Sequence, residues 1–167
     1  MLKYVGLVLI ISISSFSGIY FSATLKARLV ALKKINYLID EIMTLLRYKA
    51  STVYEIINHL IKNERFSDFS FLRNIAADSA TSFQLDWCNS LEENPPLNLK
   101  KDDLTILADI GRNLGTSDIE GQLSTLNLQQ NELKKLISSA EADCERKTKL
   151  YRSLGVLVGA FISVMLI

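Results

Sequence analysis

The sequence predicts an all-α protein, a six-helix bundle whose long first and last helices extend into apolar N- and C-terminal membrane segments. Three observations support this fold class. Apolar residues recur at steps of three and four along most of the chain. Sustained alternation of polar and apolar residues is missing, and no Asn-Gly or Asp-Gly hairpin turn occurs. All acidic residues lie between Asp40 and Glu145, which leaves both ends of the chain apolar.

Length and composition favour one domain with membrane anchors. The chain has 167 residues, of which 49% are hydrophobic, and its mean hydropathy of +0.19 is high for a soluble protein. This length accommodates one domain of about 100 to 150 residues with appendages. We expect a transmembrane helix at 1–25, a helical bundle at 26–152 and a hydrophobic membrane segment at 153–167.

The first apolar segment is long enough to span a bilayer. Tyr4 to Leu25 are 22 consecutive uncharged residues, and as a helix they reach about 33 Å, against a bilayer core of about 30 Å. A secretory signal peptide is the alternative, because Lys3 supplies a short basic start. Signal peptides have apolar cores of about 7 to 15 residues and an A-x-A-like cleavage site, which fits poorly here. We therefore expect this helix to be retained.

The C-terminal apolar segment is shorter. Ser153 to Ile167 are 15 uncharged residues, about 22 Å of helix, and by length alone they could be a core helix of a soluble domain. Apolar residues cover all faces of this helix, which favours the membrane. Close packing of two membrane helices is suggested by small residues four positions apart, although such residues are common in membrane helices generally. They are Ser14 with Gly18 and Gly155 with Gly159.

The first helix is predicted to continue from the first span to about Arg47. Its apolar residues recur at steps of three and four, at Leu25, Leu29, Leu32, Ile35, Ile39, Ile42 and Leu46. Thr52 and Glu55 then form a capping box, in which hydroxyl and carboxylate satisfy each other's backbone N–H groups. We expect this box to open a helix through about Lys62.

The middle of the chain is predicted to form three shorter helices. Two of them cover Ser70–Ala80 and Ser82–Glu93, and the only two prolines of the chain break the path at 95–96. The third runs over Lys101–Leu114. Gly115 stops it, since glycine suits the left-handed conformation of a C-terminal cap.

The last helix is predicted to be the longest. Ser117 and Glu120 read as a second capping box, and no proline follows before the end of the chain. One helix from Asp118 into the membrane would be about 50 residues, or roughly 75 Å. We expect the first and last helices to pack antiparallel as a stalk, with the short helices closing a small bundle beyond it.

Charge is distributed unevenly along the chain. Residues 26–34 and 146–152 each carry a net charge of +4, whereas residues 35–145 hold ten basic and eighteen acidic groups, a net charge of −8. The positive-inside rule therefore places the bundle in the cytoplasm and both termini outside. The basic segments would contact anionic lipid head groups, or simply form a solvated helix face. The acidic body argues against nucleic acid binding.

Residues typical of catalysis are sparse. His59 is the only histidine, and Cys88 and Cys144 lie far apart without a C-x-x-C spacing. The sequence has no phosphate-binding G-x-x-x-x-G-K-[ST] loop and no G-x-G-x-x-G motif. We predict a protein that is not an enzyme and that binds no cofactor or metal. A membrane hydrolase using buried carboxylates remains a minor alternative.

Two stretches resemble the stage III sporulation protein AB family of endospore-forming bacteria. They are LTILADIGRNLGTSDIEGQL, from Leu104 to Leu123, and the ending YRSLGVLVGAFISVMLI. This resemblance implies a membrane subunit similar to the F-type platform protein of type II secretion, whose cytoplasmic domains are six-helix bundles. It further implies a channel complex between mother cell and forespore, required for forespore development, with a secretion-type ATPase and sibling membrane subunits as partners. The subunit would sit in the mother-cell membrane surrounding the forespore, where it could form a homo-oligomer.

The turn within this motif is the first candidate for partner binding. Arg112 and Asp118 flank it, and its turn chemistry is more specific than a mere connection requires. Alternatively, Asp118 begins the next helix and pairs with Arg112 for structure alone. The second candidate is an acidic surface that includes Asp102, Asp103 and Asp109, because complementary charge steers encounter.

The sequence also allows an alternative function. A membrane-anchored regulator or sensor could bind a ligand through the same cytoplasmic helical domain. ATPase binding supports the platform function, whereas a stabilising small ligand without ATPase binding supports the sensor.

Overall fold

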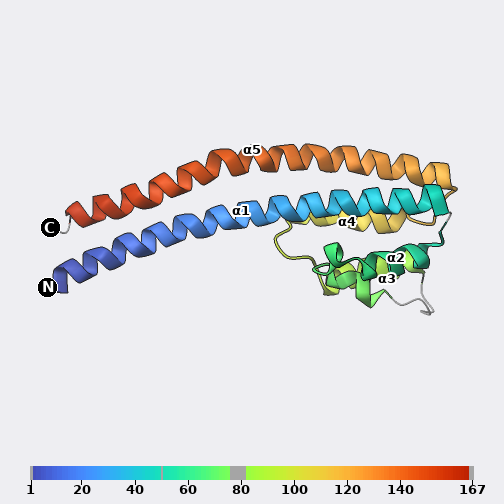
Figure 1. The fold of residues 1–167 in the computed structure, drawn as a ribbon, viewed down its shortest axis with the longest axis horizontal. Helices are drawn as coiled ribbons and strands as arrows, with labels where there is room; N and C mark the ends of the chain where they lie inside the picture. The colour runs from blue at the N-terminus through green and yellow to red at the C-terminus, as the bar shows by residue number, and fades with distance from the viewer. Residues whose placement is uncertain (1, 50, 76–81, 166–167) are drawn as a thin grey trace. The chain divides into compact units, whose positions relative to one another are not determined.

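The computed structural model describes the backbone of residues 2–49, 51–75 and 82–165, and the side chains of these residues apart from 2–19, 148–149, 151–152, 154–156 and 158–165. Five α-helices, two 3-10 helices and no strand occupy these residues. The all-α class is confirmed, but the prediction of six helices is wrong. The elements are α1 (Leu2–Lys49), α2 (Val53–Lys62), η1 (Glu64–Phe66), η2 (Ser70–Asn74), α3 (Phe83–Glu93), α4 (Lys101–Asn113) and α5 (Ile119–Met165) (Figure 1).

The chain divides into two compact units, to which the two long helices both contribute. The larger unit comprises residues 30–137, and the smaller unit comprises residues 1–29 together with 138–167. The larger unit therefore lies within the bundle predicted at 26–152. It contains the short helices and the two candidate partner-binding surfaces.

Within the larger unit, α1 contributes one strongly apolar face to the core. Its buried positions follow steps of three and four, as expected for a helix that buries one stripe of its surface. They are Leu32, Ile35, Leu38, Ile39, Ile42, Leu45 and Leu46. Each fully buried side chain of this size contributes roughly 1.5 to 3 kcal/mol relative to solvent exposure. The periodicity of the sequence predicted this face correctly.

The two long helices run antiparallel in the larger unit, as predicted. Asp40 of α1 accepts a hydrogen bond from the amide of Gln130 in α5, at 2.6 Å. Tyr48, later in α1, shares a groove with Asn127, which lies earlier in α5. A later position of α1 thus lies beside an earlier position of α5, as in antiparallel packing. Leu123, Leu126 and Leu133 supply the buried face of α5.

An aromatic cluster fills the core beneath the short helices. The indole of Trp87 in α3 is fully buried, and its centroid lies 5.1 Å from the Phe71 ring in an edge-to-face arrangement. Phe83 lies 5.8 Å from the same indole. Such pairs stabilise beyond their buried area by about 0.5 to 1.5 kcal/mol. Aromatic packing therefore contributes to holding the short elements together.

The predicted helix at 70–80 is replaced by a short 3-10 helix, η2. The buried residues of η2, Phe71 and Leu72, are adjacent and do not repeat at an α-helical spacing. Short 3-10 helices of this kind commonly serve as connectors. No side-chain cap supports the start of η2. Residues 76–80 of the predicted helix lie outside the described residues.

The first predicted capping box is present at the start of α2. The hydroxyl of Thr52 accepts the N–H of Glu55 at 3.4 Å, and the Glu55 carboxylate accepts the N–H of Thr52 at 2.8 Å. α3 begins one residue after Ser82, and α4 ends one residue before Leu114. The predicted limits of these helices are correct to within one residue.

The smaller unit joins the two ends of the chain. Small residues are buried here, namely Ser22 of α1 and Ala140 and Cys144 of α5. Short side chains allow two helix backbones to approach closely. The proposed packing residues Ser14, Gly18, Gly155 and Gly159 lie outside the residues whose surroundings the structure describes.

Candidate interaction surface

The turn between α4 and α5 owes its course to a glycine with left-handed backbone. Gly115 has φ +78°, a conformation that residues with a Cβ adopt only under strain. The Cβ of any other residue would also lie 2.9 Å from the Val53 side chain. The prediction of a left-handed glycine after α4 is therefore correct.

A buried glutamine holds the two ends of this turn together. The Oε1 atom of Gln122 accepts the N–H of Gly115 at 2.9 Å, and its Nε2 donates to the Ser117 carbonyl at 2.7 Å. Gln84 of α3 donates to the Leu114 carbonyl at 2.9 Å. Backbone groups that would otherwise lack a partner are thus satisfied by side chains of α3 and α5. These three hydrogen bonds therefore fix the backbone conformation of the turn.

Gly111 has a different role, because it makes room for Trp87. A Cβ at this position would lie only 2.1 Å from indole carbon atoms. The indole N–H donates to the Leu107 carbonyl at 2.9 Å, one helical turn before Gly111. The glycine of the Gly-Arg pair is therefore explained by packing between α3 and α4.

Asp118, rather than Ser117, caps α5. Its carboxylate accepts the N–H of Gly121 at 3.1 Å, which places Asp118 at the N-cap position of a helix that begins at Ile119. The predicted capping box of Ser117 and Glu120 is wrong, since Ser117 lies one residue before the cap. Its hydroxyl instead donates to the Asp118 carbonyl, at 3.4 Å.

Arg112 does not pair with Asp118 across the turn. Its guanidinium donates to the Asp109 carboxylate, one turn earlier in α4, at 2.9 Å. This hydrogen bond, followed by the nearby Cys88 thiol, raises the pKa of Arg112 above its ordinary value. The side chains of Arg112 and Asp109 remain 58% and 42% exposed, so this pair can also contact a partner.

One of the three aspartates predicted for the second candidate surface, the acidic surface, is not exposed. Asp103 is fully buried, and its carboxylate accepts the N–H of Lys100 at 2.8 Å at the start of α4. A carboxylate in the first helical turn also interacts favourably with the helix dipole. Asp102 is exposed, so the acidic surface retains Asp102 and Asp109.

The tip of the turn is exposed throughout. Residues 115–120 face solvent, and the Ile119 side chain is 41% exposed. The candidate interaction surface therefore consists of the Asp109–Arg112 pair and the tip at 115–120. Sequence reasoning missed Gln84, Gln122 and Trp87 as the residues that hold this surface in shape. Gln122 follows Gly115 by about two helical turns along the chain, and this spacing matches no recognisable sequence motif.

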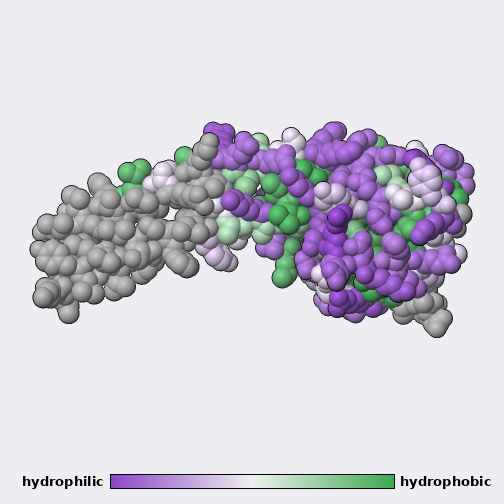
Figure 2. Space-filling model, in the orientation of Figure 1, coloured by the Kyte–Doolittle hydropathy of each residue, from purple (hydrophilic) through white to green (hydrophobic). Residues whose placement is uncertain are grey.

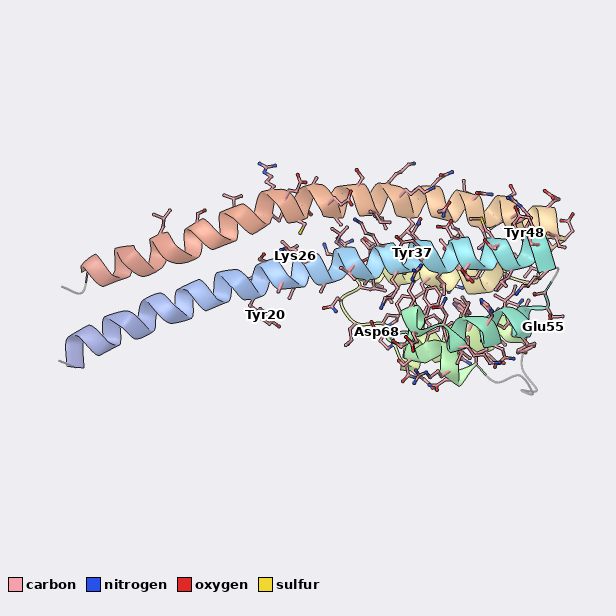
Figure 3. All side chains as sticks on the ribbon, in the orientation of Figure 1. Tyr20, Lys26, Tyr37, Tyr48, Glu55 and Asp68 are labelled. Carbon is pink, nitrogen blue, oxygen red and sulfur yellow. The ribbon has the colours of Figure 1, made fainter. Side chains whose placement is uncertain are left out.

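The exposed side of α1 carries a second feature that sequence reasoning missed. A groove of about 310 Å³ is lined by Val30, Lys33, Lys34 and Tyr37 of α1 and by Arg65 of η1. Figure 3 labels Tyr37 on α1 and Asp68 on the segment after η1. Asp68 pairs with Lys34 at 2.5 Å, and this hydrogen bond lowers the pKa of the Asp68 carboxyl below its ordinary value.

The histidine and the two cysteines of the chain also lie within the described residues. His59 of α2 lies 2.9 Å from the Glu41 carboxylate of α1. Cys88 is half-buried and Cys144 is buried, and neither is in a disulfide. Within the described part of the chain, no group of three or more His, Cys, Asp or Glu residues is arranged to hold a metal ion.

Among the described residues, no helix combines the length and apolar composition that a bilayer span requires. Most of the two segments predicted to span, 1–25 and 153–167, lies outside the residues whose side chains are described.

Comparison with known protein families identifies the chain. The family described as "Stage III sporulation protein AB" matches residues 3–167, which is nearly the full length. The chain belongs to this family. The resemblance based on residues 104–123 and the C-terminal segment is confirmed, and with it a role associated with sporulation. Neither a curated protein nor a solved structure matches the chain.

Proposed function

We propose that the protein is a non-enzymatic membrane platform subunit of the sporulation channel between mother cell and forespore. In this proposal its helical unit lies in the cytoplasm and recruits a secretion-type ATPase, and sibling membrane subunits complete the complex. Membership of the sporulation family supports the cellular process. The likeness to type II secretion platform proteins that the family resemblance implies favours the platform role, and the charge distribution favours the orientation.

The observation that carries the proposal is the turn between α4 and α5, which is exposed and whose backbone is held by side-chain hydrogen bonds. Gln122 and Gly115 hold the backbone of this turn, whereas Arg112 and Asp109 remain accessible beside it. A preorganised surface loses little conformational entropy on binding, so more of the contact energy appears as affinity.

A pull-down with the full-length chain tests this proposal. The detergent-solubilised protein should retain the cognate ATPase, and the double variant Asp109→Asn with Arg112→Gln should retain less. These changes remove both charges and leave the hydrogen bonds of Gln122 intact. The matched control is Glu132→Gln, which removes an exposed charge from α5 outside the turn.

Three outcomes distinguish the possibilities. Loss of the ATPase in the double variant alone supports recruitment through the turn. Equal binding by all variants would place the ATPase contact elsewhere. If the wild-type chain retains no ATPase, the recruitment proposal fails, and stabilisation by a small ligand would then favour the sensor.

A further inference from the structure

The groove beside α1 combines positive charge with apolar surface. Three of its five lining residues are cations, Lys33, Lys34 and Arg65. The other two are Val30 and Tyr37, whose side chains are 61% and 51% exposed. The groove therefore places exposed apolar surface directly beside three positive charges. The face of the larger unit in Figure 2 shows apolar atoms exposed among hydrophilic ones.

Contacts within the fold hold two of these cations in place. The Arg65 guanidinium carbon lies 4.7 Å from the centroid of the Tyr37 ring, a distance typical of a cation–π contact. A guanidinium held against a ring keeps its N–H donors available at its edge. Lys34 bonds to Asp68, and an ammonium group has three donors, so it can bind a second acceptor.

A second groove adjoins the first and extends the basic surface. It has a volume of about 280 Å³ and is lined by Lys33, Asn36, Tyr37, Lys134 and Ile137. Lys33 and Tyr37 line both grooves. Lys134 belongs to α5, and its ammonium group donates to Gln130 at 3.1 Å. The basic surface therefore reaches from η1 across α1 to α5.

We infer that the groove formed by Val30, Lys33, Lys34, Tyr37 and Arg65 binds the phosphate of an anionic phospholipid headgroup. Lysine and arginine bind phosphate through charge-assisted hydrogen bonds, arginine with two parallel donors. The exposed valine and tyrosine suit the apolar part of a lipid better than a free ion. The groove also begins only five residues after the end of the apolar segment at Leu25.

This inference rests on the proposed membrane anchorage and refines it. The basic segment at 26–34 accounts for Lys33 and Lys34 alone. Tyr37 lies one turn later on the same helix, and Arg65 joins them only through the tertiary structure. Specific headgroup binding therefore depends on folding, whereas general attraction of a basic segment does not. Each positive charge near an anionic lipid contributes roughly 1 kcal/mol, which corresponds to about a fivefold change in affinity.

The test uses the detergent-solubilised full-length protein and a short-chain, water-soluble phosphatidylglycerol below its micelle concentration. We expect this lipid to raise the melting temperature of the wild type in a saturable manner. Lys33→Gln and Arg65→Gln should each weaken the apparent affinity about fivefold. The matched control Lys135→Gln removes an exposed lysine of α5 that lines neither groove and should bind as the wild type does. Circular dichroism without lipid confirms that each variant is folded.

Parallel measurements identify the ligand class. An equal shift with short-chain phosphatidylcholine would overturn the inference, because that headgroup has no net charge. An equal shift with inorganic phosphate at the same concentration would overturn the lipid assignment in favour of a free anion. Affinities that do not differ between Lys33→Gln, Arg65→Gln and Lys135→Gln would show that the groove is not the site.

Flotation with vesicles of phosphatidylcholine alone separates this inference from the anchorage on which it rests. The wild type and all variants should float, because the apolar segments do not need an anionic lipid. A chain that floats without a phosphatidylglycerol shift refutes the groove alone. A chain that shows the shift but does not float refutes the anchorage alone.

Discussion

At Gly111 the backbone of α4 meets the Trp87 indole without space for a side chain. We predict that Gly111→Ala destabilises the protein by about 1 to 3 kcal/mol, because the added methyl group displaces the indole from a filled core. The higher helix propensity of alanine, about 1 kcal/mol, opposes this loss without reversing it. Urea unfolding followed by Trp87 fluorescence measures the difference. Thr105→Ala on the exposed side of α4 serves as the control, and an unchanged or higher stability of Gly111→Ala would contradict the prediction.

The ion pair of Asp68 and Lys34 makes a pH-dependent contribution to stability. Because the folded state lowers the pKa of Asp68 from its ordinary value of 3.8, this contribution is present above about pH 4. It is lost as the pH falls through the lowered value. Asp68→Asn should therefore have a lower urea midpoint than the wild type at pH 7, and the two midpoints should converge as the pH falls below the lowered pKa of Asp68. A difference that persists in acid would assign the effect to packing instead.

The side chains of the turn show which residue roles were accessible from the sequence. Gly115 was accessible, because a left-handed cap depends on local backbone chemistry. The cap of α5 was not, since Ser117 and Asp118 are both favourable N-cap residues and only the structure selects Asp118. The partner of Arg112 was not, since Asp109 and Asp118 both lie close along the chain and only the helix geometry selects Asp109. The buried state of Asp103 was also hidden, because two adjacent acidic residues look alike until one face is packed.

At the scale of the elements, the seam between α1 and α5 should depend on its buried residues. We predict that Leu133→Ala, at a fully buried position, lowers the free energy of unfolding by about 2 to 5 kcal/mol. The matched control on the same helix is Leu128→Ala, where the side chain is 63% exposed and the loss should stay within about 0.5 kcal/mol. Chemical unfolding of both variants measures the difference. Equal losses would mean that α5 is not packed through this face.

The helices differ in how well their periodicity could be recognised. In a long amphipathic helix such as α1, the apolar spacing repeats over many turns, so the pattern identifies a helix without ambiguity. The segment containing η2 has few turns, and its apolar residues do not distinguish an α-helix from a 3-10 helix. Its Phe71 packs edge-to-face against Trp87 of α3, a contact that the local spacing does not predict.

At the scale of the whole molecule, membrane topology is the property on which the proposed function depends. We predict that reporters fused to either terminus are active on the non-cytoplasmic side, because basic residues flank both apolar segments on the same inner side. Alkaline phosphatase fusions, active outside, and fluorescent protein fusions, active inside, measure this in the same strain. A cytoplasmic C-terminus would contradict the two-span topology and indicate that residues 153–167 do not cross.

The family and its role in sporulation were accessible from the sequence, because a short turn motif and a C-terminal segment are contiguous in the chain. So were the long helices and the capping of α2, which depend on residues a few positions apart. Tertiary structure alone decided which distant side chains meet. Gln122 closes the turn, Trp87 requires Gly111, and Arg65 joins Lys33 and Lys34 in one groove. The physical reason is that local backbone preferences act over a few residues, whereas packing brings together residues whose separation along the chain leaves no repeating pattern.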